Sequence, residues 1–360
     1  MKIFLLAGEA SGDLHGSHLV AELKLLHPDW EIIAWGGPLM QKAGARILSD
    51  YRDRAYMGLW EVLRHLRSIR RYIQQAQHDI DAEQPNALIF IDNPGFNLRV
   101  WKSLKAFSGK AFYYIAPKAW AWNARRAQTL VAFDAVYGIL PFEPDWFAQQ
   151  DVRCTYIGNP LMDKIPEQAH QESKEPILAL LPGSRKQEVE SLLPLMLEAA
   201  RSFPEYRVVV AATSALDPSL YQQLIPKGSA ETHFDLTYEL LAEAHMALVA
   251  SGTATLETAL FQVPQVVVYK TSALTYWAAK LFVKIPYISL VNLVAQKEVV
   301  PELIQHHCKA SGMVQALRAL EKGNPARDTQ LREYQAIRKA LGGPGVNKRL
   351  ADSISKALSL

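Results

Sequence analysis

Short apolar runs separated by longer amphipathic segments recur along the first half of the chain. The separating segments have helical periodicity, most clearly Leu14–Lys24, Trp60–Gln77 and Leu98–Phe107. Alternation of this kind predicts an α/β fold, in which a parallel sheet is covered by helices on both faces. The apolar runs that we predict to be buried strands are Lys2–Ala7, Glu31–Trp35, Ala87–Ile91, Ala111–Ile115, Ala135–Ile139 and Thr155–Ile157.

A polar segment bounded by prolines, residues 166–176, interrupts this pattern and is expected to be a linker. The alternation then starts again. We predict strands at Ile177–Leu181, Tyr206–Ala212, Met246–Ala250 and Gln265–Tyr269, and helices at Lys186–Ser202, Pro218–Leu224, Thr237–Ala244 and Ala254–Phe261. We therefore expect two doubly wound domains, 1–165 and 177–340, facing a central cleft, with ligands at the carboxyl ends of the strands. A final helix within 341–360 is expected to return to the first domain.

Composition narrows the class of protein. A chain of 360 residues with 49% hydrophobic and 21% charged residues is expected to be globular, and a formal net charge of +3 gives no reason to expect a nucleic-acid partner. The two cysteines lie far apart, which suits a reducing compartment, and no His, Cys and acidic residues have metal-ligand spacing. We find neither a signal peptide nor an apolar stretch of about 18 residues, so a cytoplasmic location is expected.

Two turns of the second half, each between a predicted strand and a helix, have the composition of a nucleotide site. In Leu181-Pro-Gly-Ser-Arg185, glycine permits close backbone approach, the helix start offers N–H groups, and the guanidinium suits a diphosphate. In Ser251-Gly-Thr-Ala-Thr-Leu-Glu257, hydroxyl and N–H groups suit phosphate oxygens, and the glutamate suits a ribose diol. The alternative for both turns is an ordinary capped helix.

A third segment, 289–302, sets Asn292, Glu298 and Glu302 among apolar neighbours. The two glutamates are four residues apart, so a helix would place them on one side, with Pro301 in its first turn. A capped surface helix is the competing interpretation. No Gx4GK[ST] phosphate loop and no GxSxG nucleophile turn occurs in the chain.

The first half carries candidate acid–base groups. Asp92 follows the buried strand Ala87–Ile91 and precedes Pro94-Gly95, which makes it a general-base candidate or, alternatively, a helix cap. The opening turn Gly8-Glu9-Ala10-Ser11-Gly12-Asp13 joins the first strand to the first helix. Its two acids would repel a phosphate, so we expect it to contact sugar hydroxyls, with Glu9 as the rival base and Asp13 as a possible cap.

Aromatic and basic residues suggest an acceptor surface. The segment Tyr113–Trp122 could wall a sugar or acyl pocket, and Lys118, Arg125 and Arg126 suit a phosphate; a core position for the tryptophans and a solvated face for the arginines are the alternative. The apolar segment 273–290 carries Lys280 and Lys284 on one helical side. This fits a membrane or lipid surface, or a core helix with snorkelling lysines.

Together these motifs resemble one family, lipid-A-disaccharide synthase, an inverting glycosyltransferase of the GT-B architecture. The resemblance rests on AGEASGD (7–13), IDNPGFN (91–97), IAPKAWAW (115–122), LPGSR (181–185), SGTATLE (251–257) and NLVAQKEVVPELIQ (292–305). Two departures lie on the expected acceptor side. Lys118-Ala119 stands where the family usually has Gln-Val, and Asn159 stands where it usually has His between Gly158 and Pro160.

The resemblance implies transfer of 2,3-diacylglucosamine from UDP-2,3-diacylglucosamine to 2,3-diacylglucosamine 1-phosphate (lipid X). The products would be UDP and a β-1,6-linked lipid A disaccharide 1-phosphate. The family works peripherally at the cytoplasmic face of the inner membrane, in lipopolysaccharide biosynthesis, and its members can form homodimers with exchanged C-terminal portions. The UDP-sugar is a substrate, so no cofactor and no metal ion is expected.

The combined prediction assigns a role to each group of residues. Asp92, or Glu9 in its place, would be the catalytic base. UDP-sugar contacts are expected from Gly183, Ser184, Arg185, Ser251, Gly252, Thr253, Thr255, Glu257, Asn292, Glu298 and Glu302. The acceptor and lipid side would comprise Ser11, Gly12, Asp13, Asn97, Lys118, Trp120, Trp122, Arg125, Lys280 and Lys284. Two alternative functions are a UDP-sugar 2-epimerase and a UDP-sugar-binding regulatory module without turnover.

Overall fold

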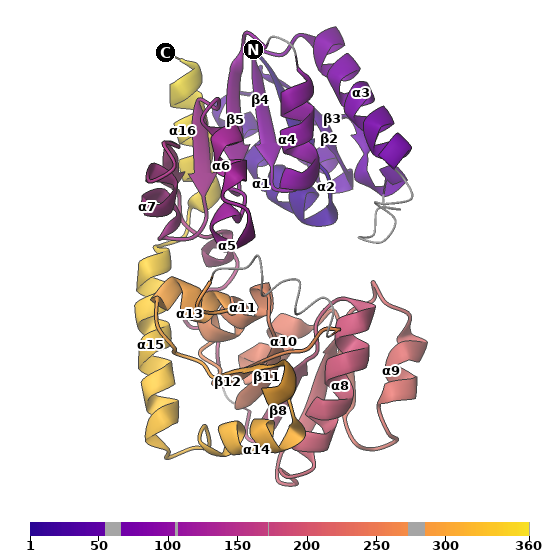
Figure 1. Cartoon of the computed structure of the whole chain (residues 1–360), viewed down its shortest axis with the longest axis vertical. Helices are drawn as coiled ribbons and strands as arrows, with labels where there is room; N and C mark the ends of the chain where they lie inside the picture. Colours follow the sequence, from indigo (N-terminus) through magenta and orange to yellow (C-terminus); the bar gives the residue numbers. More distant parts are fainter. Residues whose placement is uncertain (55–65, 105–106, 172, 273–284, 360) are drawn as a thin grey trace. The chain divides into compact units, whose positions relative to one another are not determined.

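The computed structural model describes residues 1–54, 66–104, 107–171, 173–272 and 285–359 and divides the chain into two compact units (Figure 1). Unit 1 comprises Met1–Asp163 and Gly343–Leu360, and unit 2 comprises Lys164–Gly342. The chain therefore passes from one unit to the other twice.

The segment 166–176, expected to be a linker, is attached to unit 2. The backbone N–H of Gln171 donates to the carbonyl of Ala242 at 2.7 Å, and that of Ser173 donates to the carbonyl of Glu243 at 3.2 Å. These carbonyls belong to the last turn of α10 (Thr237–Glu243), where a helix leaves its acceptors without internal partners. The polar segment is thus attached to the last turn of α10, and its role as the linker between the two domains stays a prediction.

Unit 1 is built on a seven-stranded sheet with the order β3-β2-β1-β4-β5-β6-β7, in which every pairing is parallel. The central strands are continuous apolar runs because both of their faces are covered. The strands are β1 (Lys2–Ala7), β2 (Glu31–Gly36), β3 (Arg46–Asp50), β4 (Ala87–Ile91), β5 (Lys110–Tyr114), β6 (Ala135–Gly138) and β7 (Cys154–Tyr156).

Helices cover both faces of this sheet. One face carries a core that includes Phe4 and Leu6 of β1 together with buried residues of α3, α4 and α6. On the other side α1 packs against α16, which brings the end of the chain back to the first helix (Figure 1). The helices of unit 1 are α1 (Ala10–Leu26), α2 (Pro38–Lys42), α3 (Leu66–Glu83), α4 (Pro94–Ser103), α5 (Ala119–Trp122), α6 (Arg125–Leu130), α7 (Glu143–Ala148) and α16 (Val346–Leu358), with short 3-10 turns η1 (Tyr51–Arg54) and η2 (Pro160–Asp163).

Asp163 fixes α16 to unit 1. Its carboxylate accepts hydrogen bonds from the backbone N–H groups of Val346 and Asn347 at 3.1 and 3.3 Å and from the Asn347 side chain at 2.9 Å. An acid at this point satisfies N–H groups of the first turn and interacts favourably with the helix dipole.

Unit 2 repeats the same plan with a six-stranded parallel sheet of order β10-β9-β8-β11-β12-β13. Its strands are β8 (Ile177–Leu181), β9 (Arg207–Ala212), β10 (Glu231–Phe234), β11 (Met246–Ala250), β12 (Gln265–Tyr269) and β13 (Glu302–Ile304). The remaining helices are α8 (Lys186–Ala200), α9 (Pro218–Leu224), α11 (Thr253–Leu260), α13 (Leu290–Ala295), α14 (Ala310–Arg318) and α15 (Pro325–Leu341), with the 3-10 turn η3 (Gln305–His307). Residues of α8, α9 and α14 share one core with the sheet, while α11, α13 and α15 contact one another.

These two parallel sheets with helices on their faces confirm the predicted α/β class. Every predicted strand is present with its ends shifted by at most a residue or so, whereas β3, β10 and β13 were not predicted. The missed strands are short and carry charged residues at their ends, because each lies at or near a sheet edge where burial is incomplete. The helix expected at Leu98–Phe107 begins earlier, at Pro94, and ends at Ser103.

Candidate active site

The site in unit 1 begins where β1 and β4 lie side by side at the centre of the sheet. Ala7 pairs with Ile91, so the turns that carry Gly8 and Asp92 leave the sheet next to each other. The strand order reverses here, since β1 leads to β2 on one side and pairs with β4 on the other. Open α/β sheets bind ligands at such a switch point, outside the carboxyl ends of the strands.

The backbone of Asp92 is held in an unusual conformation. Its φ is 46° and that of Asn93 is 41°, the left-handed region that costs most side chains about 1–3 kcal/mol but that Asp and Asn tolerate best. The Asp92 carbonyl accepts hydrogen bonds from the Asn97 side chain at 2.8 Å and the Tyr113 hydroxyl at 2.6 Å. Asn97 and Tyr113 are fully buried, so they act as a fixed clamp on the backbone from which the Asp92 side chain extends.

The electrostatic surroundings of Asp92 suit a proton acceptor. Burial raises the pKa of its carboxyl group above the ordinary value, while a hydrogen bond from the Asn93 backbone and the positive charge of Lys118 act in the opposite direction. A carboxylate whose pKa is raised is a stronger base, and perturbed acids at strand ends are typical of catalytic sites.

The opening turn packs directly against the Asp92 turn. A side chain at Gly8 would collide with the Asn93 amide, so glycine is needed here for the close approach of the two turns. Glu9 and Ser11 are exposed at the start of α1. The structure thus brings Glu9, Ser11 and Asp92 to the same edge of the unit 1 sheet.

Other residues on the expected acceptor side are buried and support the fold of unit 1. Asp13 is fully buried, and its oxygens accept hydrogen bonds from the backbone N–H groups of Leu39 and Met40 at 3.1 and 3.0 Å, which caps α2. Gly12 lies where a Cβ would come within 3.1 Å of the Ala7 side chain, so it allows α1 to pack on β1. Asn159, which stands where the family usually has His, also serves the fold. Its side chain is buried, donates to the Ile139 carbonyl at 3.0 Å and accepts from the Leu161 N–H at 3.0 Å.

The aromatic segment after β5 contributes to the core more than to a pocket. We expected this segment to wall a sugar or acyl pocket. Tyr113 and Tyr114 are fully buried, however, so neither of them lines an open pocket. Trp120 is half-buried and donates its indole N–H to Glu143 at 3.1 Å. Glu143, which the sequence analysis missed, is buried and also accepts from the Ile139 and Leu140 N–H groups at 2.8 and 2.9 Å.

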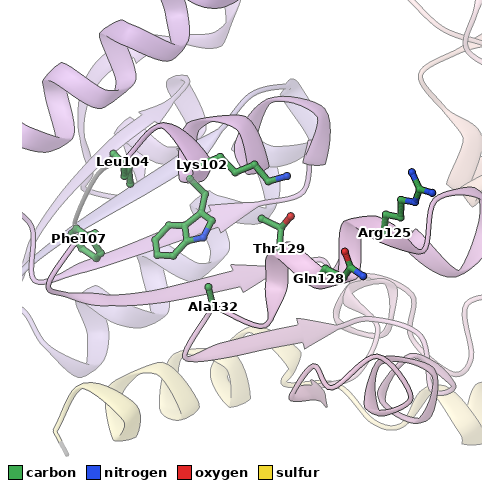
Figure 2. Close-up of a pocket in the computed structure, with 8 residues that line it drawn as sticks. Lys102, Leu104, Phe107, Arg125, Gln128, Thr129 and Ala132 are labelled. Atoms are coloured by element: carbon green, nitrogen blue, oxygen red, sulfur yellow. The ribbon is translucent and has the colours of Figure 1, made fainter.

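Three residues expected on the lipid side cannot be placed. Lys280 and Lys284 lie outside the described residues, as does the side chain of Trp122. Lys118 is exposed, and its charge acts on the carboxyl groups of both Asp92 and Glu143. Arg125 is exposed and lines a groove between α4 and α6 (Figure 2).

In unit 2 the two predicted nucleotide turns also meet at a switch point. Leu181 of β8 pairs with Val249 of β11, so the turns that follow them are adjacent. Gly183 has a φ of 102°, which favours glycine. The Arg185 side chain is 83% exposed and makes a long contact of 3.5 Å with Glu188, which caps the start of α8. Its guanidinium therefore projects beside a helix N-terminus, an arrangement that suits an anion.

The second turn divides into exposed and buried parts. Gly252 and Thr253 are exposed at the start of α11, and no atom of the described residues, apart from the adjoining chain, would lie within 4 Å of a Cβ at Gly252. In contrast, Thr255 is fully buried and donates to the Gly252 carbonyl at 2.8 Å. The Ser251 hydroxyl donates to the Ile288 carbonyl at 3.0 Å. The backbone at Gly252 and Thr253 is thus the accessible part, and the Thr255 hydroxyl serves the fold.

Glu257 has a partner that the sequence analysis missed. The Tyr238 hydroxyl donates to its Oε1 atom at 2.8 Å from the neighbouring helix α10. Burial raises the pKa of Glu257, while Tyr238 and the charge of Lys164 lower it. Because Tyr238 donates to one oxygen, the other oxygen is the acceptor that Glu257 retains for a ligand hydroxyl.

The third segment differs most from the prediction. Residues 298–302 are not helical, because Pro301 leads into β13, whose first residue is Glu302. Asn292 is fully buried, accepts from the N–H groups of Val299 and Val300 and donates to Val300 and Glu302. Glu302 also accepts from the Ile288 and Ser289 N–H groups, each at 2.9 Å. The two side chains fasten this loop to α13, and of the predicted trio only Glu298 is exposed.

The comparisons with known proteins decide the family. The model of the LpxB family, described as lipid-A-disaccharide synthetase, matches residues 3–352. The chain belongs to this family. A lipid-A-disaccharide synthase from Myxococcus xanthus is 35% identical over 99% of this chain and 97% of its own length. One from Syntrophus aciditrophicus is 36% identical over 97% of this chain and 96% of its own length.

Solved structures agree on the fold. The chain resembles a UDP-GlcNAc 2-epimerase from Neisseria meningitidis with a TM-score of 0.68 at 13% identity, covering 99% of this chain and 100% of that one. It resembles the calicheamicin glycosyltransferase CalG4 with a TM-score of 0.64 at 17% identity, covering 99% and 98%. The lipid-A-disaccharide synthetase family consists of glycosyltransferases, so the chain is an enzyme of this class with the GT-B fold.

In the part of the chain that the structure describes, no group of three or more His, Cys, Asp or Glu residues is arranged to hold a metal ion. No helix there is both long and apolar enough to span a membrane. The expectation that the reaction of this family member needs no metal stays a prediction.

Proposed function

We propose that the protein transfers 2,3-diacylglucosamine from UDP-2,3-diacylglucosamine to lipid X and forms the β-1,6-linked lipid A disaccharide 1-phosphate and UDP. Family membership supports the reaction, and the observation that carries the mechanism is the half-buried Asp92, with its fixed backbone, at the switch point of unit 1. The epimerase alternative has only the shared fold in its favour, and the alternative of a regulatory module without turnover lacks a supporting observation.

Asp92 acts as the general base in this proposal. Its carboxylate accepts the proton of the acceptor 6-hydroxyl while that oxygen attacks the anomeric carbon on the face opposite to UDP. The C–O bond to UDP breaks as the new bond forms, which inverts the configuration. The raised pKa and the Asn97–Tyr113 clamp support this role, because a base must be both basic and positioned. Glu9, exposed at the same sheet edge, is the rival base.

Unit 2 holds the donor in this proposal. The diphosphate lies at the start of α8 and α11, next to Arg185 and the backbone N–H groups of Gly252 and Thr253. The exposure of these groups and the two helix N-termini support the assignment. The negative charge that builds up on the departing UDP is then stabilised without a metal ion. Glu257 accepts hydrogen bonds from the ribose hydroxyl groups through the oxygen that Tyr238 leaves available.

The cellular setting follows from the substrates. Both carry acyl chains, so we propose that the enzyme works as a peripheral protein at the cytoplasmic face of the inner membrane. A homodimer with exchanged C-terminal portions stays a prediction.

The direct test is to incubate the purified protein with UDP-2,3-diacylglucosamine and lipid X in detergent micelles and follow UDP and disaccharide together. We expect both products in equal amounts and neither when one substrate is omitted. Formation of an epimerised sugar nucleotide, or binding of UDP-sugar without any turnover, would contradict the proposal.

A further inference from the structure

A groove on unit 1, outside the residues assigned to the base, has the chemistry of a lipid site. It lies between the end of α4 and α6 and has a volume of about 670 Å³ (Figure 2). Its apolar lining comes from Trp101, Leu104 and Phe107, which are half-buried. The Trp101 ring packs on Phe133 of the core with ring centroids 4.7 Å apart, so this lining has a rigid base.

Two positively charged side chains also line this groove. Lys102 and Arg125 both line it and both are exposed, and no carboxylate within the described ranges pairs with either. The groove therefore joins an apolar surface to the two exposed cations Lys102 and Arg125, which suits an anionic amphiphile.

The two ends of the groove lie toward opposite edges of the unit 1 sheet. Phe107 precedes β5, whereas Arg125 begins α6, which follows the carboxyl end of that strand. In Figure 2 the strand arrows accordingly point toward the end at which Arg125 lies, and Leu104 and Phe107 occupy the opposite end. Arg125 thus lies toward the sheet edge that carries Asp92, Leu104 and Phe107 lie away from it, and Lys102 lies between them.

We propose that this groove binds the acceptor, with its phosphate at Arg125 and Lys102 and one acyl chain along Trp101 and Phe107. The inference rests on the proposed function. In 2,3-diacylglucosamine 1-phosphate, the phosphate and both acyl groups are on carbons 1 to 3, whereas the 6-hydroxyl is on the carbon attached to C5, and C2 is the ring atom opposite C5. A sugar whose 6-hydroxyl meets Asp92 therefore directs its phosphate and its chains away from the base together. Going away from the sheet edge that carries Asp92, the groove presents first Arg125 and then the apolar residues Trp101 and Phe107.

The test compares two variants in the groove with two matched variants elsewhere on unit 1. Ala132→Phe places a ring in the groove, and Arg125→Gln removes a charge. The controls Ala148→Phe and Arg153→Gln change exposed residues that do not line it. The measurements are KM for the donor, KM for lipid X, and KM for an analogue of lipid X with two-carbon acyl groups.

We expect Ala132→Phe to raise KM for lipid X by about tenfold or more, the equivalent of two buried methylene groups, and to leave KM for the short-chain analogue unchanged. Arg125→Gln raises KM for both acceptors by a similar factor, since both carry the phosphate. Neither variant changes KM for the donor, and the controls match the wild type.

Two results would overturn the inference. One is an unchanged KM for lipid X in Ala132→Phe. The other is a variant that loses sedimentation with vesicles of anionic phospholipid while its KM for lipid X in micelles stays the same, which would assign the groove to bilayer lipid. Equilibrium binding of labelled lipid X needs no turnover, so comparing wild type with Ala132→Phe tests the groove even if the proposed transfer reaction fails.

Discussion

Replacing Asp13 by alanine is expected to destabilise unit 1 and to leave acceptor binding unchanged. The side chain is fully buried, and its two oxygens accept hydrogen bonds from the Leu39 and Met40 N–H groups at 3.1 and 3.0 Å in the first turn of α2. A hydrogen bond to a charged group contributes about 1.5–3 kcal/mol, and loss of a helix cap costs about 0.5–2 kcal/mol. The cap consists of these same two hydrogen bonds, so the two ranges are not added; two bonds at the lower value of about 1.5 kcal/mol each give a fall of about 3 kcal/mol in the free energy of unfolding.

Calorimetry turns this figure into a measurable shift. For a unit of this size each kcal/mol lowers the unfolding midpoint by about 2–4 °C, so the transition of unit 1 should fall by about 6–12 °C. Scanning calorimetry is the suitable method, since a chain with two units need not unfold in one step. Asp13→Asn keeps one acceptor oxygen and should lose roughly half as much. Asp29→Ala removes an exposed acid of the same unit and serves as the control.

The reasoning about Asp13 fails if the midpoint of Asp13→Ala stays within about 2 °C of the wild type while KM for lipid X rises. That pattern would return Asp13 to the acceptor site, where the sequence had suggested it.

Three further predictions concern the electrostatics of the site. Lys118→Met removes a positive charge that lowers the pKa of Asp92, so the acid limb of kcat against pH should move to higher pH, as a pH–rate profile would detect. Activity depends on the ionised base, so kcat should fall as the pH drops through that pKa. Tyr238→Phe removes the hydrogen bond to Glu257, worth about 1 kcal/mol, so KM for the donor should rise about fivefold with little change in kcat, whereas an unchanged KM would refute the ribose assignment. Arg185→Gln should raise KM for the donor about 10–100-fold, since a charged hydrogen bond to the diphosphate is worth roughly 1.5–3 kcal/mol, and an effect on KM for lipid X instead would contradict the placement.

The sequence predicts the fold well because the strands of a covered parallel sheet are continuous apolar runs. The edge strands β3, β10 and β13 escape this signal, since incomplete burial permits charged residues in them. The positions of Asp92 and of the two unit 2 turns also follow from sequence, because a polar turn after a buried strand must lie at the carboxyl edge of the sheet.

The sequence cannot separate a polar side chain that serves a ligand from one that serves the backbone. Thr255, Asn292 and Glu302 all belong to motifs of the family, yet the first two are fully buried and all three bond to neighbouring chain segments. For Asn292 and Glu302 the partners are main-chain groups of other segments, such as the Val300 carbonyl and the Ile288 N–H, and spacing alone does not show which groups will meet. The same limit hides Tyr238 as the partner of Glu257, since the two residues lie on different helices.

The most direct test of the central claim compares kcat of Asp92→Asn with kcat of Glu9→Gln at saturating donor and lipid X. Asparagine matches the size of Asp92 and tolerates its left-handed backbone, so the first variant removes the base and little else. The account predicts that Asp92→Asn lowers kcat by at least about 100-fold with both KM values nearly unchanged, and that Glu9→Gln lowers kcat less than about tenfold. If Asp92→Asn keeps kcat within about tenfold of the wild type while Glu9→Gln loses activity, Glu9 is the base and the account is wrong.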